Sequence, residues 1–334
     1  MILAGDIGGT HARLAFFDVS NGGFRLVSAA VFPSREYAGL DQIVSRFVET
    51  SNLHPEAACF GVAGPVRDGR VEASNLPWVI ESKRLASELK LDHVTLINDL
   101  EANAWGISLL ETKDVVPLNH VKGTPVGNQA VISAGTGLGE AGMYWDGTQH
   151  QIFACEGGHA DFAPRNDLEI DLLRYLSARY EHVSCERIVS GPGLVNVFQF
   201  LRDTGRGTEP QWLKDQISQG DPAAAISRAA LDGSCGLCVQ ALDLFVSAYA
   251  AEAGNLALKF MAMGGVYLGG GIAPKILGKL SGPLFMNAFT GKGRMQALLE
   301  AIPVMVITND KAALLGAARY AVAHGVQQMV NLRN

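Results

Sequence analysis

The stretch Gly5-Asp6-Ile7-Gly8-Gly9-Thr10-His11 decides how the first part of this 334-residue chain folds. Apolar runs precede it at residues 2–4 and follow it at residues 12–19, so the two glycines lie in a hairpin turn between strands. Consecutive glycines let the backbone turn with its amide groups pointing inward, and such a concavity binds phosphate oxygens without a basic side chain. A hairpin turn with no ligand explains the same residues equally well, so this stretch alone leaves both interpretations open.

A second turn of this kind favours the phosphate-binding interpretation. It reads Gly135-Thr136-Gly137-Leu138-Gly139 and lies between strand-like runs at residues 129–134 and 140–145. Two Gly-Thr turns at matching places in a duplicated fold predict a clamp for a polyphosphate, with the turns facing each other across a cleft between two domains. In such a clamp Thr10 supplies a hydroxyl group, and Asp6 holds a metal ion through water.

Outward from these turns, the apolar pattern predicts an α/β protein with an internal duplication. The first half has strands at residues 2–4, 12–19, 24–32, 57–63 and 94–97, with helices near 40–48 and 82–89 and after Asn98-Asp99. This order, βββαβαβα, implies a mixed sheet with crossover helices. The second half continues with a strand at 151–155, helices from about 167 to 263, strands at 266–268 and 304–307, and a helix at 312–324 that Gly325 caps. Each half begins with strand, Gly-Thr turn and strand, and ends with strand, Asn-Asp and helix.

Composition and charge limit the classes of protein to which the chain can belong. At roughly 150 residues per domain, its length predicts two domains. Hydrophobic residues make up 48% and charged residues 18%, which indicates a globular protein, and the net charge of −6 argues against binding to nucleic acid or to an anionic membrane surface. The N-terminus lacks the basic region of a signal peptide, and the longest apolar stretch, residues 260–274, is too short to span a bilayer. We therefore expect a cytoplasmic protein without a membrane or nucleic-acid partner.

The five cysteines are expected to be reduced thiols, because an odd number in a long chain does not suit a disulfide framework. They are Cys59, Cys155, Cys185, Cys235 and Cys238. Only Cys235 and Cys238 have the CxxC spacing of a zinc site, and no second pair of ligands is spaced to complete one. We therefore expect this pair to be structural.

Asp99 is the strongest candidate for a catalytic residue. It follows an apolar strand and opens a helix, which is where ligands bind in an open α/β sheet. An Asp at a helix start is more commonly an N-cap, so the position also permits a structural role. Beside a phosphate clamp, the chemical interpretation is a base that accepts a hydroxyl proton as the oxygen attacks phosphorus. Its neighbour Asn98 can donate and accept hydrogen bonds, which suits a ligand rich in hydroxyl groups.

Three more polar residues are candidates for binding such a ligand. Glu156 and His159 flank two glycines on a loop that a ligand can approach closely; a metal site is the alternative, with only two local ligands. Glu186 stands at a predicted helix start, where complementing the helix dipole is the simpler role. Together with Asn98 and Asp99, they would satisfy the hydroxyl groups of a hexose, each of which is costly to bury unpaired.

A third glycine-rich segment, Gly269-Gly270-Gly271, follows an apolar strand. It lacks the GxGxxG spacing of dinucleotide-binding folds, and the chain contains no GxxxxGK(S/T) motif. We expect the triplet to let a flat adenine ring lie against the backbone, although a tight strand-to-helix connection explains it equally well.

Six runs of sequence resemble one known family. They are GDIGGTHARLAFFD, VTLINDLEANAWGI, SAGTGLGEAG, EGGHADFAP, SCERIVSGPGLVN and LGGGIAP. In this order, and over nearly the whole chain, they resemble the bacterial glucokinase family, in the non-ROK branch of the hexokinase, actin and Hsp70-like superfamily. The resemblance implies an α/β fold of two RNase H-like, actin-type ATPase domains with a cleft between them. It implies a small α/β domain at residues 1–109 and 304–334 and a larger α+β domain at 110–303.

The resemblance also implies roles for individual residues. Asp99 matches the catalytic base, and the glucose-binding positions are Asn98, Asp99, Glu156, His159 and Glu186. The nucleotide-binding positions are Gly5, Asp6, Ile7, Gly8, Gly9, Thr10, Gly135, Thr136, Gly137, Gly139, Gly270 and Gly271, with Asp6 near Mg²⁺ through water. The chain departs from the family at His11, where Asn is frequent, and it lacks the cysteine-rich zinc motif of the ROK sugar kinases.

On this resemblance, the chain is expected to transfer the γ-phosphoryl group of MgATP to the 6-hydroxyl group of D-glucose, at the entry to glycolysis. The expected cosubstrate is ATP, the expected cofactor is Mg²⁺, and the expected assembly is a cytoplasmic homodimer. Two alternatives stay open. One is a kinase for another hexose, because the orientation of a single hydroxyl group is decided by geometry that a sequence does not contain. The other is a sugar-sensing, ATP-binding protein without turnover.

Overall fold

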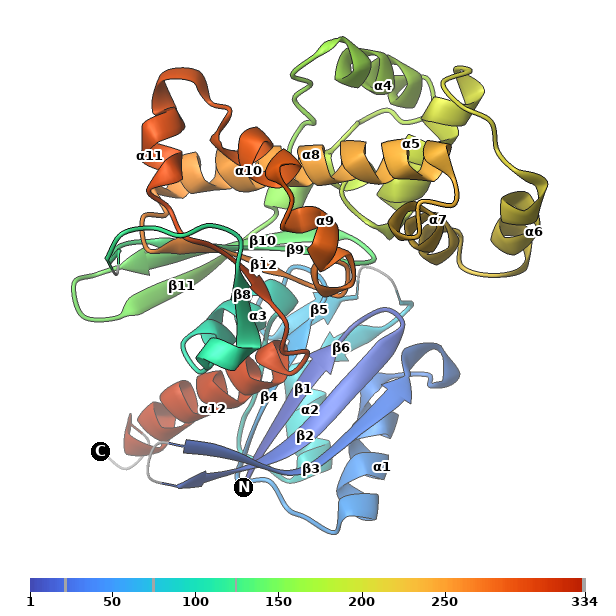
Figure 1. Ribbon diagram of the computed structural model, residues 1–334. Helices are drawn as coiled ribbons and strands as arrows, with labels where there is room; N and C mark the ends of the chain where they lie inside the picture. The colour runs from blue at the N-terminus through green and yellow to red at the C-terminus, as the bar shows by residue number, and fades with distance from the viewer. Residues whose placement is uncertain (21–22, 74–75, 124, 332–334) are drawn as a thin grey trace. The chain divides into compact units, whose positions relative to one another are not determined.

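The computed structural model describes residues 1–20, 23–73, 76–123 and 125–331 of the chain (Figure 1). The chain forms two compact units, the first made of Met1–Asp114 with Asn309–Asn334 and the second of Val115–Thr308. Each unit is built around its own β-sheet. The mixed α/β class that the apolar pattern predicts is thereby confirmed.

The sheet of the first unit has the order β3-β2-β1-β4-β7. Its strands are β1 (Ile2–Ile7), β2 (His11–Ser20), β3 (Gly23–Pro33), β4 (Ala57–Val62) and β7 (Val94–Asn98). β1, β2 and β3 form an antiparallel meander, whereas β4 runs parallel to both β1 and β7. This is the mixed sheet with crossover helices that the element order predicts.

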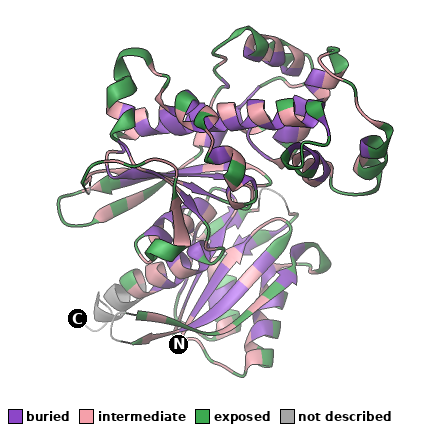
Figure 2. Cartoon of the chain, in the orientation of Figure 1, coloured by how far each residue is buried: buried purple, intermediate pink, exposed green. Residues whose placement is uncertain are grey.

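Helices cover both faces of this sheet. They are α1 (Leu40–Ser51) and α2 (Ser82–Leu89) on one face, and α3 (Asp99–Ile107) and α12 (Ala312–Asn331) on the other. Alternate residues of β2 point to opposite faces, so Phe16 packs in the core with α1 and α2 while Phe17 packs in the core with α3 and α12. The central strands are therefore buried on both sides, as the purple ribbon of β1 and β4 in Figure 2 shows.

The sheet of the second unit has the order β11-β10-β9-β12-β13-β8. Its strands are β8 (Val115–Pro117), β9 (Gln129–Ala134), β10 (Leu138–Trp145), β11 (His150–Cys155), β12 (Gly265–Gly269) and β13 (Val304–Ile307). β9, β10 and β11 form an antiparallel meander, and β12 runs parallel to β9 and β13. The first five strands in this order therefore repeat the order and the directions of the first sheet, and β8 is an addition at the edge.

Helices make up most of the rest of the second unit. They are α4 (Asp167–Ser177), α5 (Gly191–Asp203), α6 (Gln211–Gln219), α7 (Pro222–Leu231), α8 (Gly236–Phe260), α9 (Leu277–Leu280), α10 (Pro283–Thr290) and α11 (Gln296–Glu300). The long helix α8 packs against β9, where the hydroxyl group of the buried Tyr249 donates to the carbonyl oxygen of Ile132 at 3.1 Å. Within the described ranges no single helix is long and apolar enough to cross a membrane. Only by adding their lengths and apolar residues do α7 and α8, which are bent by 100° at their junction, reach that size.

Short 3₁₀ turns connect several of these elements. They are η1 (Ser34–Glu36), η2 (Thr112–Asp114), η3 (Gly157–His159), η4 (Cys185–Arg187), η5 (Ala273–Ile276) and η6 (Gly293–Met295). All five cysteines are free thiols, and all but Cys155 are buried.

The structure differs from the sequence-based expectations in a few elements. The small hairpin of β5 (Arg70–Glu72) and β6 (Val79–Glu81) occupies part of a region we expected to be a turn, and β8 was not expected. The prediction that Gly325 caps the last helix is wrong, because α12 continues to Asn331; one glycine inside a helix costs only about 1 kcal/mol relative to alanine. β13 pairs in the sheet of the second unit, although the resemblance assigns residues from 304 onward to the small domain. The domain boundaries at 109–110 and 303–304 stay a prediction.

Candidate active site

The first glycine turn is held in place by its own strand and by the end of β3. The backbone N–H of Gly8 donates to the carbonyl oxygen of His11 at 3.0 Å, and the hydroxyl group of Ser34 donates to the carbonyl oxygen of Gly8 at 2.8 Å. Ser34 is fully buried, and its backbone N–H also donates to Thr10 at 3.0 Å. In the described part of the chain, the N–H groups of Gly9 and Thr10 have no protein acceptor. The turn is therefore fixed while two consecutive amides remain available to an anion.

Asp6 stands at the end of β1, directly before this turn. It lies opposite Arg13 in the β1–β2 pairing, and Arg13 Nη1 is 3.1 Å from Asp6 Oδ2. Burial raises the pKa of the Asp6 carboxyl group, and the Arg13 charge offsets part of that rise. One carboxylate oxygen of Asp6 is thus engaged by Arg13.

The corner between β7 and α3 places Asn98 and Asp99. Asn98 is the N-cap of α3: its Oδ1 accepts from the backbone N–H of Leu100 at 2.8 Å, and its Nδ2 donates to the carbonyl oxygen of Gly64 at 3.2 Å. Asp99 is the first residue of the helix, with Oδ1 3.0 Å from the N–H of Leu100. The capping role that an Asp here could have taken belongs to Asn98 instead.

The first turn and this corner lie at one edge of one sheet. β1, β4 and β7 are parallel, and Ile7, Val62 and Asn98 occupy the same row of the register. Neighbouring strands are about 4.8 Å apart, so Ile7 and Asn98 lie roughly 10 Å apart across β4. The fold therefore brings the Gly8–Gly9 turn and Asp99 to the same sheet edge, where parallel strands end and ligands bind in α/β sheets.

The second glycine turn is built differently. The N–H of Gly135 donates to the carbonyl oxygen of Gly137 at 2.8 Å, and the N–H of Leu138 donates to Glu186 Oε2 at 2.9 Å. A Cβ atom at Gly137 would overlap Glu186 Oε2, so a glycine is needed there to admit the carboxylate. The N–H groups of Thr136 and Gly137 have no protein acceptor within the described ranges. This turn also presents two free amides, and it places Glu186 against its base.

Gly270 lies beside the second turn. β9 and β12 are parallel neighbours, and the N–H of Ile272 donates to the carbonyl oxygen of Ala134 at 3.2 Å. Gly270 has a φ of +80°, and a Cβ atom there would overlap the same carbonyl oxygen, so this position requires glycine. At Gly271 a Cβ atom would meet open space. Gly270 and Gly271 are both exposed.

Glu156 and His159 stand at the ends of a short 3₁₀ turn rather than on an open loop. Both side chains are exposed, whereas Gly158 between them is buried against Leu138. The N–H of Cys185 donates to the carbonyl oxygen of Ala160 at 2.9 Å, which joins η3 to η4. The second unit therefore brings Glu156, His159 and Glu186 together with the second glycine turn.

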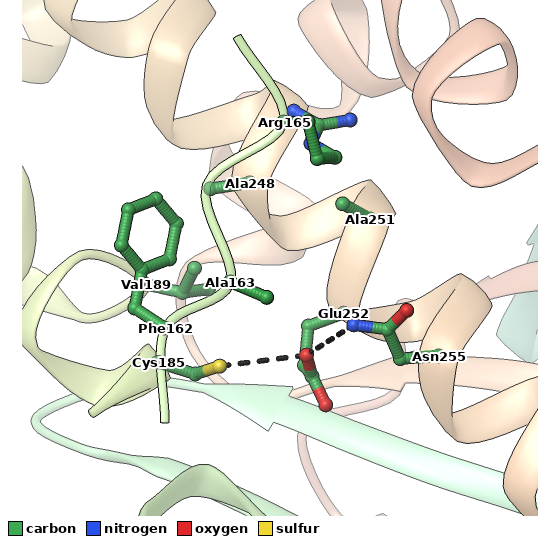
Figure 3. Close-up of a pocket in the computed structure, with 9 residues that line it drawn as sticks. All are labelled: Phe162, Ala163, Arg165, Cys185, Val189, Ala248, Ala251, Glu252 and Asn255. Atoms are coloured by element: carbon green, nitrogen blue, oxygen red, sulfur yellow. Dashed lines mark hydrogen bonds between the residues drawn. The ribbon is translucent and has the colours of Figure 1, made fainter. Parts of the chain in front are cut away.

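Besides Glu169, which is paired with Arg165, two buried carboxyl groups escaped the sequence analysis. Glu140 on β10 is 1% exposed, and Glu252 on α8 is 5% exposed. Glu252 borders a small cavity whose lining side chains are shown in Figure 3: Phe162, Ala163, Arg165, Cys185, Val189, Ala248, Ala251, Glu252 and Asn255. Its Oε2 accepts from Asn255 Nδ2 at 2.8 Å and from Cys185 Sγ at 3.4 Å, the two dashed lines of Figure 3. In the sequence, the only sign that Glu140 and Glu252 are buried is that each is a charged residue inside an otherwise apolar strand or helix.

Comparisons with known proteins identify the family of this chain. A family model described as Glucokinase matches residues 3–324. A glucokinase of Nostoc sp. is 44% identical over 334 residues, which cover 95% of this chain and 98% of that protein. The chain belongs to the glucokinase family. This confirms the family resemblance that the six sequence runs indicate.

Solved structures of glucokinases have the same fold. The crystal structure of a glucokinase from an Antarctic psychrotroph matches with a TM-score of 0.81 at 31% identity, covering 96% of this chain and 98% of that one. A glucokinase from Balamuthia mandrillaris, crystallised in complex with glucose, matches with a TM-score of 0.80 at 23% identity, covering 96% and 93% of the two chains. The family and its fold are thus established over nearly the full length.

Proposed function

We propose that this chain is an ATP-dependent glucokinase, which transfers the γ-phosphoryl group of MgATP to the 6-hydroxyl group of D-glucose. The observation that carries the proposal is the full-length match to the glucokinase family by a chain that has both amide-presenting turns and Asp99 at the sheet edge beside one of them. Phosphoryl transfer depends almost entirely on positioning and electrostatic stabilisation, and these elements supply both.

The nucleotide is assigned to the glycine turns. The free amides of Gly9, Thr10, Thr136 and Gly137 would bind phosphate oxygens, and the open backbone at Gly271 would take the adenine ring. Five strands of each sheet have the same order, which supports a duplicated, RNase H-like architecture; the cleft between two domains is what the family resemblance implies. ATP bound to both turns would then lie in that cleft.

Asp6 suits Mg²⁺ that arrives with the nucleotide. In the described part of the chain, no three His, Cys, Asp or Glu side chains are grouped to hold a metal ion by themselves. Mg²⁺ needs no such cage, since it keeps several waters and binds through one or two carboxylates together with substrate phosphates. Arg13 contacts Asp6 Oδ2, so Asp6 Oδ1 would provide that carboxylate oxygen beside the first turn. When bound, Mg²⁺ neutralises charge on the phosphates undergoing transfer.

Glucose is assigned to Asp99, Glu156, His159 and Glu186, with Asn98 in a mainly structural part. Both amide atoms of Asn98 already bond to backbone, so its chief contribution would be to fix Asp99 at the start of α3. Carboxylates and an imidazole accept and donate the hydrogen bonds that a hexose requires, and each buried hydroxyl left unpaired would be costly.

Asp99 would act as the general base. Its carboxylate would accept the proton of the 6-hydroxyl group as that oxygen attacks the γ-phosphorus, and ADP would leave. Closure around both substrates would exclude water, which otherwise would accept the phosphoryl group in place of the sugar. We further propose that the protein works in the cytoplasm, as a homodimer, at the entry of glucose into glycolysis.

The test is release of ADP by the purified protein with MgATP, measured with glucose, without sugar, and with fructose, mannose or glucosamine. Release that depends on glucose, with glucose 6-phosphate as product, is the expected result. A higher kcat/KM for another hexose would mean that this hexose, rather than glucose, is the preferred substrate. No ADP release with any of these sugars, in a folded protein that still binds glucose, would leave the sugar-sensing alternative.

A further inference from the structure

Glu140 lies beneath the turn that carries Glu156 and His159. It is on β10, directly after Gly139 of the second glycine turn, and it pairs with Cys155, the last residue of β11. The thiol of Cys155 donates to the Glu140 carbonyl oxygen at 3.4 Å. The Glu140 side chain is buried, and its Oε1 has no hydrogen-bond partner among the described residues.

The carboxyl group of Glu140 packs against Gly157. A Cβ atom at Gly157 would overlap Glu140 Oε2, so the carboxyl oxygen occupies the space directly under the backbone of the turn. Gly157 follows Glu156 and is two residues before His159. A movement of the Glu140 side chain would therefore displace the backbone that orients both of these residues.

The groups around Glu140 decide its charge. Glu252, Lys259 and Tyr249 face it from α8, Cys155 and Glu156 lie at the end of β11, and Cys185 lies in η4. Glu252 is 3.4 Å from Lys259 and accepts from Asn255, and both contacts stabilise its carboxylate. Burial and the Glu252 charge raise the pKa of Glu140 to about 8, against a smaller lowering by Lys259. Most of the Glu140 carboxyl group is therefore protonated at pH 7.

We infer that Glu140 is a positioning residue for the hexose, which supports the Glu156–His159 turn in its protonated form and weakens sugar binding when it loses its proton. The inference rests on the proposed function. An ionised Glu140 would be a second buried carboxylate facing Glu252, with one oxygen unpartnered, and such a charge is strongly disfavoured in place. The side chain would move toward water, and the turn above it would move as well.

The experiment is isothermal titration calorimetry of glucose binding between pH 6.5 and pH 9.5, on the full-length protein and on Glu140→Gln. Glutamine keeps the shape of the protonated acid and cannot ionise. In the unsubstituted protein the Kd for glucose should rise by about tenfold between pH 7 and pH 9, since binding requires the protonated form. In Glu140→Gln the Kd should stay within about twofold over this range. A flat profile in the unsubstituted protein, or the same rise in both proteins, would overturn the inference.

Two further variants complete the design. Asp146→Asn makes the same chemical change in the exposed turn at the far end of the β10–β11 hairpin, and it should keep the rise in Kd. If Glu140→Gln does not fold, Glu252→Gln serves instead. It removes the neighbouring negative charge, lowers the pKa of Glu140, and should move the rise in Kd to lower pH; an unmoved rise would contradict the inference. Absence of glucose-dependent ADP release at pH 7 in the unsubstituted protein would refute the proposed function, whereas normal release with identical pH profiles would refute only the role of Glu140.

Discussion

The two Gly-Thr turns occupy the same place in two sheets of the same strand order, yet different side chains surround them. The first follows Asp6, which is paired with Arg13, and a hydroxyl group from Ser34 holds it. The second follows Ser133, which carries no charge, and a carboxylate from outside the sheet, Glu186, holds it. Both sheets therefore carry a turn with two free amides, but the side chains around the two turns differ. On the proposed function, the first turn would serve the metal-bound nucleotide, and the second would link the nucleotide to the sugar through Glu186.

The Asn-Asp corners show the same contrast. Asn98 Oδ1 accepts from the N–H of Leu100, two residues on, and Asn309 Oδ1 accepts from the N–H of Lys311 at 2.9 Å, also two residues on. The two asparagines therefore make the same side-chain contact, although Asn98 directly precedes α3 and α12 begins three residues after Asn309. The difference lies in the following aspartate, because only Asp99 is assigned to the proposed chemistry and Asp310 is not.

The largest expected effect separates these two aspartates. Asp99→Asn should lower kcat for glucose phosphorylation about 100-fold or more, since an amide cannot accept the hydroxyl proton, while the Kd for glucose changes by less than about threefold. Asp310→Asn, the matched substitution at the other corner, should leave kcat within about twofold. Steady-state ADP release and calorimetry measure the two quantities. Near-normal turnover in Asp99→Asn would show that another group is the base.

The helices that follow the corners cross closely, and this crossing gives the second prediction. A Cβ atom at Gly316 of α12 would overlap the carbonyl oxygen of Ala102 and lie 2.6 Å from the backbone nitrogen of Gly106 on α3. Backbone atoms cannot move aside, so Gly316→Ala should cost about 2 kcal/mol of stability despite the better helix propensity of alanine. Thermal unfolding should show a drop of several degrees in Tm. The control is Gly236→Ala in α8, which has open space around it and should leave Tm unchanged or slightly higher.

The third prediction concerns the link between the second turn and Glu186. In Gly137→Ala the new methyl group would meet the flexible end of Glu186, so the carboxylate should leave Leu138 while the fold persists. We expect the Kd for glucose to rise about tenfold with a change in Tm of less than about 2 °C. Glu186→Ala should give a similar loss, and the double variant little more, because both changes remove the same contact.

An additive double variant would instead mean that Gly137 and Glu186 act separately. Gly135→Ala is the control for stability: a Cβ atom there meets nothing within 4 Å, so its Tm should match that of the unsubstituted protein.

Sequence patterns were sufficient to predict the elements that depend on local rules. The glycine turns, the meander before each crossover and the corner at Asn98 all follow from periodicity and turn chemistry. The contacts between distant residues were not predictable: the hydroxyl of Ser34 on Gly8 joins residues 26 apart, and Glu186 meets Leu138 across 48. The burial of Glu140 and Glu252 was not predictable for the same reason, because it depends on how β10 meets α8. At Gly325 the local signal for a helix end was misleading, because α12 continues to Asn331.

The smallest expected effect compares two buried serines, one behind each turn. Ser34 Oγ donates to Gly8, and Ser190 Oγ donates to the carbonyl oxygen of Glu186 at 2.8 Å. Removing one such hydrogen bond costs about 1 kcal/mol, or roughly a fivefold change in an equilibrium constant. Ser34→Ala should therefore raise KM for MgATP about fivefold and leave KM for glucose unchanged, because it loosens only the first turn.

Ser190→Ala also removes the N-cap contact with the N–H of Gly193. It should therefore loosen the segment that places Glu186 and raise KM for glucose by about fivefold or more, while KM for MgATP stays unchanged. Steady-state kinetics with each substrate varied in turn distinguishes the two patterns, and both variants should keep the kcat of the unsubstituted protein within about threefold. If both serine variants raise the same KM, the two turns do not divide the substrates between them, and the specialisation inferred from Asp6 and Glu186 is wrong.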